Sequence, residues 1–177
     1  MNPLIKRSIV HHEQMLGVPL DYLRSLADVS SGLFAKFTLA VPAAAHRKHA
    51  PRDAWHLARV GATRVQDCGT CVQYVVNAAR LDGVAPEVLR AALADNTTAL
   101  GEAEHLALQF GEAVAARTDE VEALRVRLTE TIGTEAAVEL ALAVAMVQVY
   151  PILKRGLGQS IACARVEIAV DGDAVSG

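Results

Sequence analysis

Proline and glycine punctuate this chain at intervals, and they stand where helices would begin and end. Asn2-Pro3 has the form of a helix start and Gly17 that of a helix end. Pro51 and Pro86 would open later helices, and Pro42 and Gly133 would close others. Pro151 would break or kink a helix, and a separate last helix would span residues 152–165. Proline suits a first helical turn because its missing N–H has no partner there, and glycine accepts the left-handed backbone that ends many helices. The spacing predicts a succession of short helices.

Composition supports the same fold class. The chain has 177 residues, of which 52% are hydrophobic but only 4% aromatic, so its core must consist mostly of Ala, Val and Leu. Alanine and leucine favour helices, and the aromatic enrichment of all-β folds is missing. We therefore expect an all-α fold, a compact bundle of about eight or nine short helices. One domain should span residues 1–165, followed by a flexible tail at 166–177.

Charge and hydropathy argue against two classes of partner. The net charge is −3, and no cluster of Lys and Arg is interleaved with aromatic residues, so nucleic-acid binding is not expected. Residues 1–14 are rich in charge and lack the apolar core of a signal peptide. The most apolar stretch, residues 136–149, is interrupted by Glu139 and Gln148 and falls short of the roughly 20 residues that cross a bilayer. We expect a cytoplasmic protein with no membrane contact.

The apolar excess also predicts association between copies of the chain. The mean hydropathy of +0.26 is high for a small monomer. Residues 140–147 are apolar nearly all round, which is typical of a helix in the centre of a core or between subunits. We therefore expect a homo-oligomer.

Cys68 and Cys71 are the strongest chemical signal in the sequence. Cys-x-x-Cys on a helix places two thiols one turn apart, within reach of a disulfide. Asp67 is expected to cap this helix, so that Cys68 lies in the first turn, where the helix dipole stabilises a thiolate. The carboxylate of Asp67 has the opposite effect because it disfavours a second negative charge nearby. The sequence leaves open which effect is larger.

Two other interpretations of these cysteines remain open. They could be inert core thiols, because free cysteine is among the most buried residue types. They could also be half of a zinc site, completed by two of His46, His49 and His56. Cys163 has no partner at a useful spacing and is expected to be a core residue.

Residues 53–85 resemble the carboxymuconolactone decarboxylase / alkylhydroperoxidase D-like family. They combine a helix, Cys68-x-x-Cys71 and the run Asn-Ala-Ala-Arg-Leu-Asp-Gly-Val at 77–84, closely followed by Pro86-Glu87. The later run from residue 118 through residue 141 also resembles the second half of that family. Residues 51–150 correspond to the family core, and residues 1–50 match it more loosely.

The resemblance implies an all-helical, alkylhydroperoxidase D-like fold, a homo-oligomer (trimer, hexamer or dimer) and a peroxidase mechanism. Redox-active members carry the signature Glu-x(11)-Cys-x-x-Cys-x(3)-His. In them the second cysteine attacks a hydroperoxide, the first resolves the sulfenic acid as a disulfide, and Glu and His relay the proton. Carried over to this chain, Cys71 would be the peroxidatic cysteine and Cys68 the resolving one.

The two relay positions differ from that signature. Val75 stands where the relay histidine would be, and His56 stands where the relay glutamate would be. Imidazole has an ordinary pKa near 6.5, so His56 could accept the proton of Cys71 directly. A histidine that merely lines a helix interface is the other interpretation.

The sequence thus predicts a thiol-disulfide oxidoreductase that reduces a small hydroperoxide or disulfide in a pocket lined by Val, Leu and Tyr74. Its catalytic residues would be Cys71, Cys68 and His56. It would need no metal or organic cofactor, but it would need an external protein or thiol reductant. Two alternatives remain: a catalytically degenerate helical oligomer that binds a small hydrophobic ligand or a partner protein, and a lactone decarboxylase.

Overall fold

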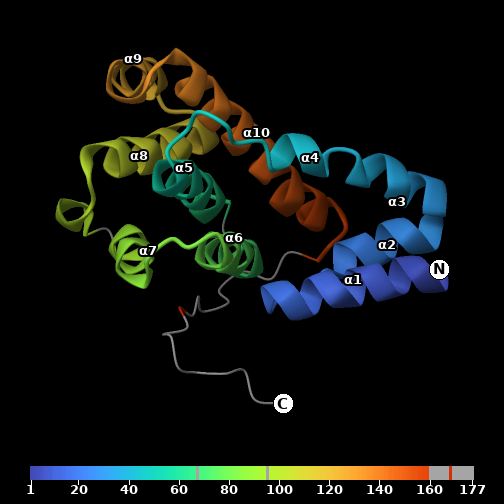
Figure 1. Cartoon of the computed structure of the whole chain (residues 1–177). Coiled ribbons are helices and arrows are strands. Elements are labelled where there is room, and N and C mark those ends of the chain that lie inside the picture. Colours follow the sequence, from blue (N-terminus) through green and yellow to red (C-terminus); the bar gives the residue numbers. More distant parts are fainter. Residues whose placement is uncertain (67, 95, 160–167, 169–177) are drawn as a thin grey trace.

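The computed structural model describes residues 1–66, 68–94, 96–159 and 168, and within them it is all-helical, without a strand (Figure 1). This confirms the predicted fold class. The α-helices are α1 (Pro3–Leu16), α2 (Asp21–Val29), α3 (Ser31–Thr38), α4 (Val41–Ala44), α5 (Arg52–Arg64), α6 (Gly69–Leu81), α7 (Pro86–Leu93), α8 (Glu102–Ala116), α9 (Val121–Ile132) and α10 (Thr134–Gly156). Of the expected tail, only Ile168 is described, and it packs half-buried against the main core. The rest of 166–177 and Cys163 lie outside the described residues.

The ends of several helices follow the proline and glycine pattern. The side chain of Asn2 accepts a hydrogen bond from the backbone N–H of Leu4 at 2.9 Å, and Pro3 occupies the first turn of α1. Gly17 ends α1 with φ of 63°, and Gly133 separates α9 from α10 with φ of 88°. A side chain is strained at such positive φ values, whereas glycine is not.

Two prolines act differently from the prediction. Pro42 was expected to stop a helix, but it lies in the first turn of the single-turn helix α4, where proline is well tolerated. Pro151 was expected to break or kink the helix before it, yet α10 continues through it to Gly156. Its ring removes one backbone hydrogen bond, and Pro151 is buried, so packing on the rest of the fold holds the helix together. Of the separate last helix expected at 152–165, residues 152–156 therefore belong to α10.

Helix α5 is the most enclosed helix of the described fold. All ten residues from 54 to 63 are buried, and α8, α10 and α6 pack around it (Figure 1). Its contact with α8 is the most extensive between any two helices. Two glycines make the close approach possible, because a Cβ on Gly61 would lie 2.3 Å from the carbonyl oxygen of Leu108 and one on Gly111 would lie 2.0 Å from that of Ala58.

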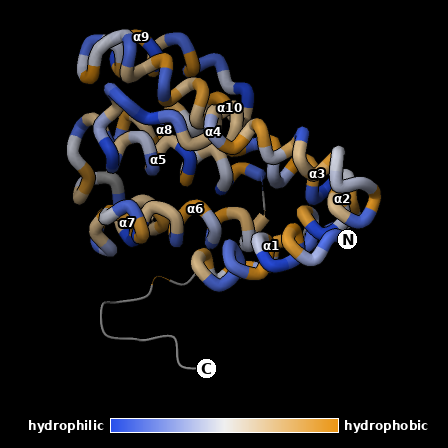
Figure 2. The backbone as a smooth tube through the Cα atoms, turned by 45° about the vertical axis from the view of Figure 1, so that its right-hand side comes forward, coloured by the Kyte–Doolittle hydropathy of each residue, from blue (hydrophilic) through white to orange (hydrophobic). Residues whose placement is uncertain are grey.

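Helix α10 is less enclosed than its apolar sequence suggested. Val138, Leu142, Val149 and Ile152 are exposed, while the opposite side of the helix packs into the core. Figure 2 shows this mixture of hydrophobic and hydrophilic residues along the helices. Within the described residues, α10 is the one helix long and apolar enough to cross a membrane, but 44% of its most apolar window is buried, and core helices meet the same criteria. Whether a second copy of the chain covers its exposed side stays a prediction.

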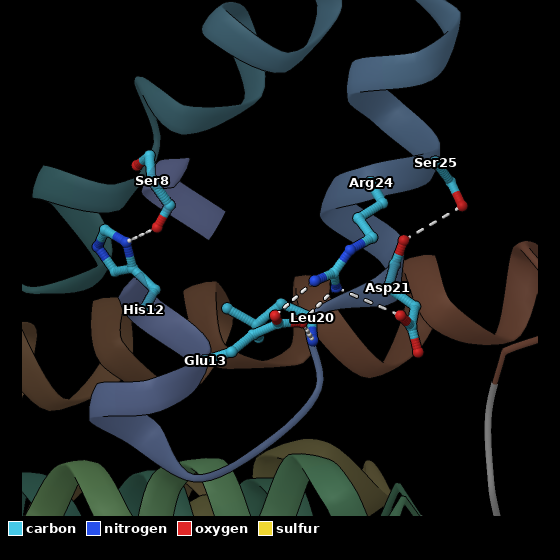
Figure 3. A network of polar contacts seen from close by, with 7 residues as sticks. All are labelled: Ser8, His12, Glu13, Leu20, Asp21, Arg24 and Ser25. Carbon is cyan, nitrogen blue, oxygen red and sulfur yellow. Dashed lines mark hydrogen bonds and ion pairs between the residues drawn. The ribbon is translucent and has the colours of Figure 1, made fainter. Parts of the chain in front are cut away.

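The N-terminal helices form a corner beside the main bundle. Both oxygens of Glu13 on α1 bind the guanidinium of Arg24 on α2, and Glu13 Oε1 also accepts the backbone N–H of Leu20 at 2.7 Å (Figure 3). Glu13 therefore binds both the Arg24 side chain and the backbone N–H at the start of α2, and these contacts fix the angle between the two helices. The corner buries a small cluster of its own, which contacts Tyr74 and Tyr150 of the main bundle.

A buried carboxylate ties the loop before α5 to α10. Glu139 Oε2 accepts the backbone N–H groups of Lys48, His49 and Ala50 at 3.0, 2.9 and 2.9 Å. Burial by itself would raise the pKa of Glu139, but these three hydrogen bonds favour the carboxylate and lower its pKa to about 2. The loop that carries His46 and His49 is therefore held to α10 by the Glu139 side chain.

Replacing Gly111 by alanine tests the approach of α5 and α8. The new Cβ would overlap the carbonyl of Ala58, so one helix must move, and we expect a loss of about 1–3 kcal/mol or more in the free energy of unfolding. Urea denaturation measures it. Gly156→Ala is the control, since its Cβ would meet nothing within 4 Å, and it should change stability by less than about 1 kcal/mol. Equal stability of the two variants would contradict the packing argument.

Replacing Glu139 by glutamine tests the loop anchor. At pH 7 we expect a loss of about 1–3 kcal/mol, because three backbone N–H groups lose a charged acceptor. The folded-state pKa of about 2 lies below the ordinary 4.5, so the carboxylate stabilises the fold fully above pH 4.5 and progressively less as the pH falls towards 2. Urea denaturation at pH 7, 4 and 3 should show the two proteins converging. Glu135→Gln, an exposed change on α10, is the control, and a pH-independent gap would count against this role.

Candidate active site: the Cys68–Cys71 pair

Cys68 and Cys71 lie in direct contact at the start of α6. Their Sγ atoms are 2.6 Å apart, both cysteines are free, and their side chains are only 1% and 7% exposed. Cys68 is itself the N-cap residue, and its carbonyl accepts the N–H groups of Cys71 and Val72. The prediction gave that cap to Asp67, which lies outside the described residues. Formation of a disulfide at this distance requires only a small movement of the sulfurs.

The environment separates the pKa values of the two thiols. Burial would raise the pKa of Cys68, but hydrogen bonds from the Cys71 side chain, the Thr70 hydroxyl and the Cys71 backbone, together with the charge of Lys154, lower it overall. Burial and the hydrogen bond with Cys68 raise the pKa of Cys71 to about 12. When the pair loses one proton, the charge therefore resides on Cys68 and the remaining proton on Cys71.

Lys154 is the site residue that the sequence analysis missed. It comes from the end of α10, is buried, and donates a hydrogen bond from Nζ to the hydroxyl of Thr70, whose Oγ1 is 3.7 Å from Cys68 Sγ. Its positive charge favours ionisation of both thiols. One signal in the sequence could have found it, because Lys154 follows Val147 by two helical turns and so lies on the buried side of α10.

A small cavity reaches Cys71. Its volume of 20 Å³ admits about one water molecule. Its walls come from the α1–α2 corner, α5, α6 and α10 and comprise Val18, Pro19, Leu20, Tyr22, Thr63, Thr70, Cys71, Tyr74, Val75, Val147, Tyr150 and Lys154. Cys68 is not among them. The cavity has the valine, leucine and Tyr74 lining that the sequence analysis expected, and Val75 occupies the position of the family's relay histidine.

The structure does not bring His56 to the thiols. Its Nε2 is 3.0 Å from Asp82 Oδ2, and its Nδ1 is 3.5 Å from Arg59 Nη1. Among the described residues, no hydrogen bond joins His56 to either cysteine. The expected direct transfer of a proton from Cys71 to His56 is therefore not supported by a contact between them. Burial and the neighbouring Arg59 lower the pKa of His56 to about 4, so the ring is neutral at pH 7.

The histidines of the zinc hypothesis are also dispersed. His46 Nε2 lies 3.5 Å from Glu139 Oε1, in the loop that Glu139 holds, whereas His56 pairs with Asp82. Within the described ranges, no three residues among His, Cys, Asp and Glu are grouped so that they could bind a metal ion. The arrangement that remains is a dithiol beside a buried cation, which is suited to thiol-disulfide chemistry.

Thiol titration with a Lys154 variant tests this electrostatic arrangement. In the reduced protein, iodoacetamide should label Cys68 at lower pH than Cys71, as followed by peptide mass spectrometry from pH 4 to 10. Lys154→Met should raise the pKa of Cys68 and slow its labelling at pH 7 several-fold, because a nearby positive charge is lost. Lys36→Met removes the same charge from an exposed site on α3 and should have no effect. Unchanged labelling of Cys68 in Lys154→Met would rule out the role of the cation.

Comparisons with known proteins assign neither a family nor a function to this chain. No protein-family model, curated protein or solved structure matches the chain. The family resemblance of the Cys68-x-x-Cys71 segment therefore stays a prediction from its residues.

Proposed function

We propose that the protein is a thiol-disulfide oxidoreductase that reduces small hydroperoxides through Cys68 and Cys71. One observation carries the proposal: two buried thiols in contact, with separated pKa values, lie beside the positive charge of Lys154 and next to a cavity that reaches one of them. Inert core thiols would not require a buried lysine nearby, because an ammonium group is costly to bury.

Cys71 is the attacking cysteine in this proposal because it alone of the pair lines the cavity. The Cys68 thiolate accepts the proton of Cys71 across the contact between the sulfurs. The Cys71 thiolate then attacks the terminal oxygen of the hydroperoxide, the O–O bond breaks, and Cys71 becomes a sulfenic acid. The leaving alkoxide takes the proton that Cys68 had received and departs as an alcohol.

The second step closes the disulfide. Cys68, again a thiolate, attacks the sulfur of the Cys71 sulfenic acid, and the S–OH bond breaks to release hydroxide, which becomes water on taking a proton from solvent. Two thiols are oxidised to one disulfide while one hydroperoxide is reduced to an alcohol and water. Lys154 stabilises the thiolate present before each attack. An external thiol or protein reductant must restore the pair.

The cavity favours a small substrate. Room for about one water molecule suits hydrogen peroxide or the terminal oxygens of a small alkyl hydroperoxide, while a bulky substrate would require the side chains to move. The walls are largely apolar, apart from Thr63, Thr70 and Lys154. Lys154 and Thr70 are the polar groups beside the sulfurs, so they are the candidates to orient the peroxide.

Stoichiometric oxidation tests the proposal. In a Cys163→Ser background, one equivalent of hydrogen peroxide should convert Cys68 and Cys71 to a disulfide, seen as the loss of two hydrogens from the peptide that contains both. Cys68→Ser should leave a sulfenic acid on Cys71 that dimedone traps, and Cys71→Ser should abolish rapid peroxide consumption. Turnover should need added dithiothreitol.

The outcomes separate this function from the alternatives. Two free thiols after treatment with peroxide would contradict the oxidoreductase proposal and favour a ligand-binding helical protein. A dimedone adduct on Cys68 in the Cys71→Ser variant, formed as fast as that on Cys71 in Cys68→Ser, would reverse the roles of the two cysteines. The parent Cys163→Ser protein is the matched control throughout.

A further inference from the structure

A second and larger pocket shares Tyr74 and Tyr150 with the thiol cavity. Its volume of 480 Å³ is in the range of small-molecule sites. Residues of α1, α4, α5, α6 and α10 line it, and it opens to solvent. Apolar side chains form much of the wall, including Met15, Leu16, Val41 and Leu81.

Arg59 of α5 is a buried cation in this pocket. Its side chain is 7% exposed, and no carboxylate of the described residues lies within ion-pairing distance of it. Its Nε has no hydrogen-bond partner, and its Nη1 is 3.5 Å from the ring nitrogen of His56. The guanidinium lies over the ring of Trp55, 4.4 Å from the ring centroid. A stacking contact offsets part of the cost of burying this charge, but it provides no acceptor for the N–H groups.

Trp55 carries a second buried donor without a partner, beside Arg59. It lines the pocket with Arg59, and its Nε1 is buried without a hydrogen-bond partner. Buried donors in folded proteins nearly always have an acceptor. Two adjacent residues with unpaired donors therefore indicate that an acceptor belongs here.

The charges around the pocket leave an excess of one positive charge. Asp82 Oδ2 is 2.9 Å from Arg47 Nη2 and 3.0 Å from His56 Nε2, so its charge is already offset by Arg47. His56 is neutral at pH 7, and the Nδ1–H of His12 donates to the carbonyl of Ser8 at 2.8 Å. Arg59 remains as the cation without a counter-ion.

We infer that this pocket binds a small organic acid with one carboxylate and an apolar body. The carboxylate pairs with the Arg59 guanidinium and neutralises the buried charge. The apolar body packs against the aliphatic side chains of α1, α4 and α6. This inference does not rest on the thiol chemistry, although the shared wall of Tyr74 and Tyr150 would place the acid beside the thiol cavity.

Octanoate and its neutral isostere octanamide provide the first test. Trp55 is the only tryptophan in the chain, so its fluorescence reports binding directly, with isothermal calorimetry as the second measurement. Octanoate should bind and shift the emission of Trp55, and octanamide should bind at least about tenfold more weakly, because it cannot neutralise Arg59. No binding of octanoate, or equal binding of the two probes, would overturn the inference.

Variants then assign the carboxylate site. Arg59→Gln should weaken octanoate binding by at least about tenfold and abolish the preference over octanamide. Arg90→Gln, an exposed change on α7 outside the pocket, is the matched control and should leave affinity unchanged. Full affinity in folded Arg59→Gln, verified by circular dichroism, would contradict the assignment. If that variant does not fold, the comparison of the two probes on the wild-type protein decides.

The Cys71→Ser variant keeps the two proposals apart. Octanoate should bind it as tightly as it binds the wild-type protein, whatever the result of the peroxide experiment. Loss of octanoate binding in this variant would show that the acid occupies the thiol cavity and would overturn the pocket assignment.

Discussion

The close contact between α5 and α8 organises the fold around a central helix. Gly61 and Gly111 let the two backbones approach so closely that a Cβ at either position would overlap a carbonyl group. This contact places α5 in the middle of the fold, where its residues contribute to both cavities. Thr63 lines the thiol cavity, and Trp55, His56 and Arg59 line the larger pocket. A helix so enclosed can hold a cation away from water, because the surrounding helices fix its side chains.

Two tyrosines connect the two cavities and the two cores. Tyr74 of α6 and Tyr150 of α10 pack with ring centroids 6.2 Å apart, and both contact the N-terminal cluster as well. Tyr22 and Phe37 complete this aromatic group. The few aromatic rings of the chain are thus concentrated where α1–α3 meet the bundle. Tyr74 and Tyr150 line both the cavity of 20 Å³ and the pocket of 480 Å³.

Local signals in the sequence predicted where helices begin and end better than they predicted how the helices pack against one another. Asn2, Pro3 and Gly17 act directly on the backbone of their own helix, so the bounds of α1 were predictable. The continuation of α10 through Pro151 was not, because packing against distant residues outweighs the local loss of one hydrogen bond. Tertiary packing likewise decides which helix is most enclosed. Residues 140–147 are the more apolar, yet α5 has the glycine that permits a close neighbour.

Helix propensity and Cys-x-x-Cys spacing act over a few residues, so the all-helical fold and the pair of thiols one turn apart follow from local sequence. The surroundings of that pair follow from contacts between distant parts of the chain. Lys154 reaches Thr70 from the far end of α10, and His56 turns to Asp82 and Arg59 instead of Cys71. The pKa of a buried group depends on charges and hydrogen-bond donors that the fold brings close to it. These groups lie far apart along the chain, so their sequence separation does not predict that they become neighbours.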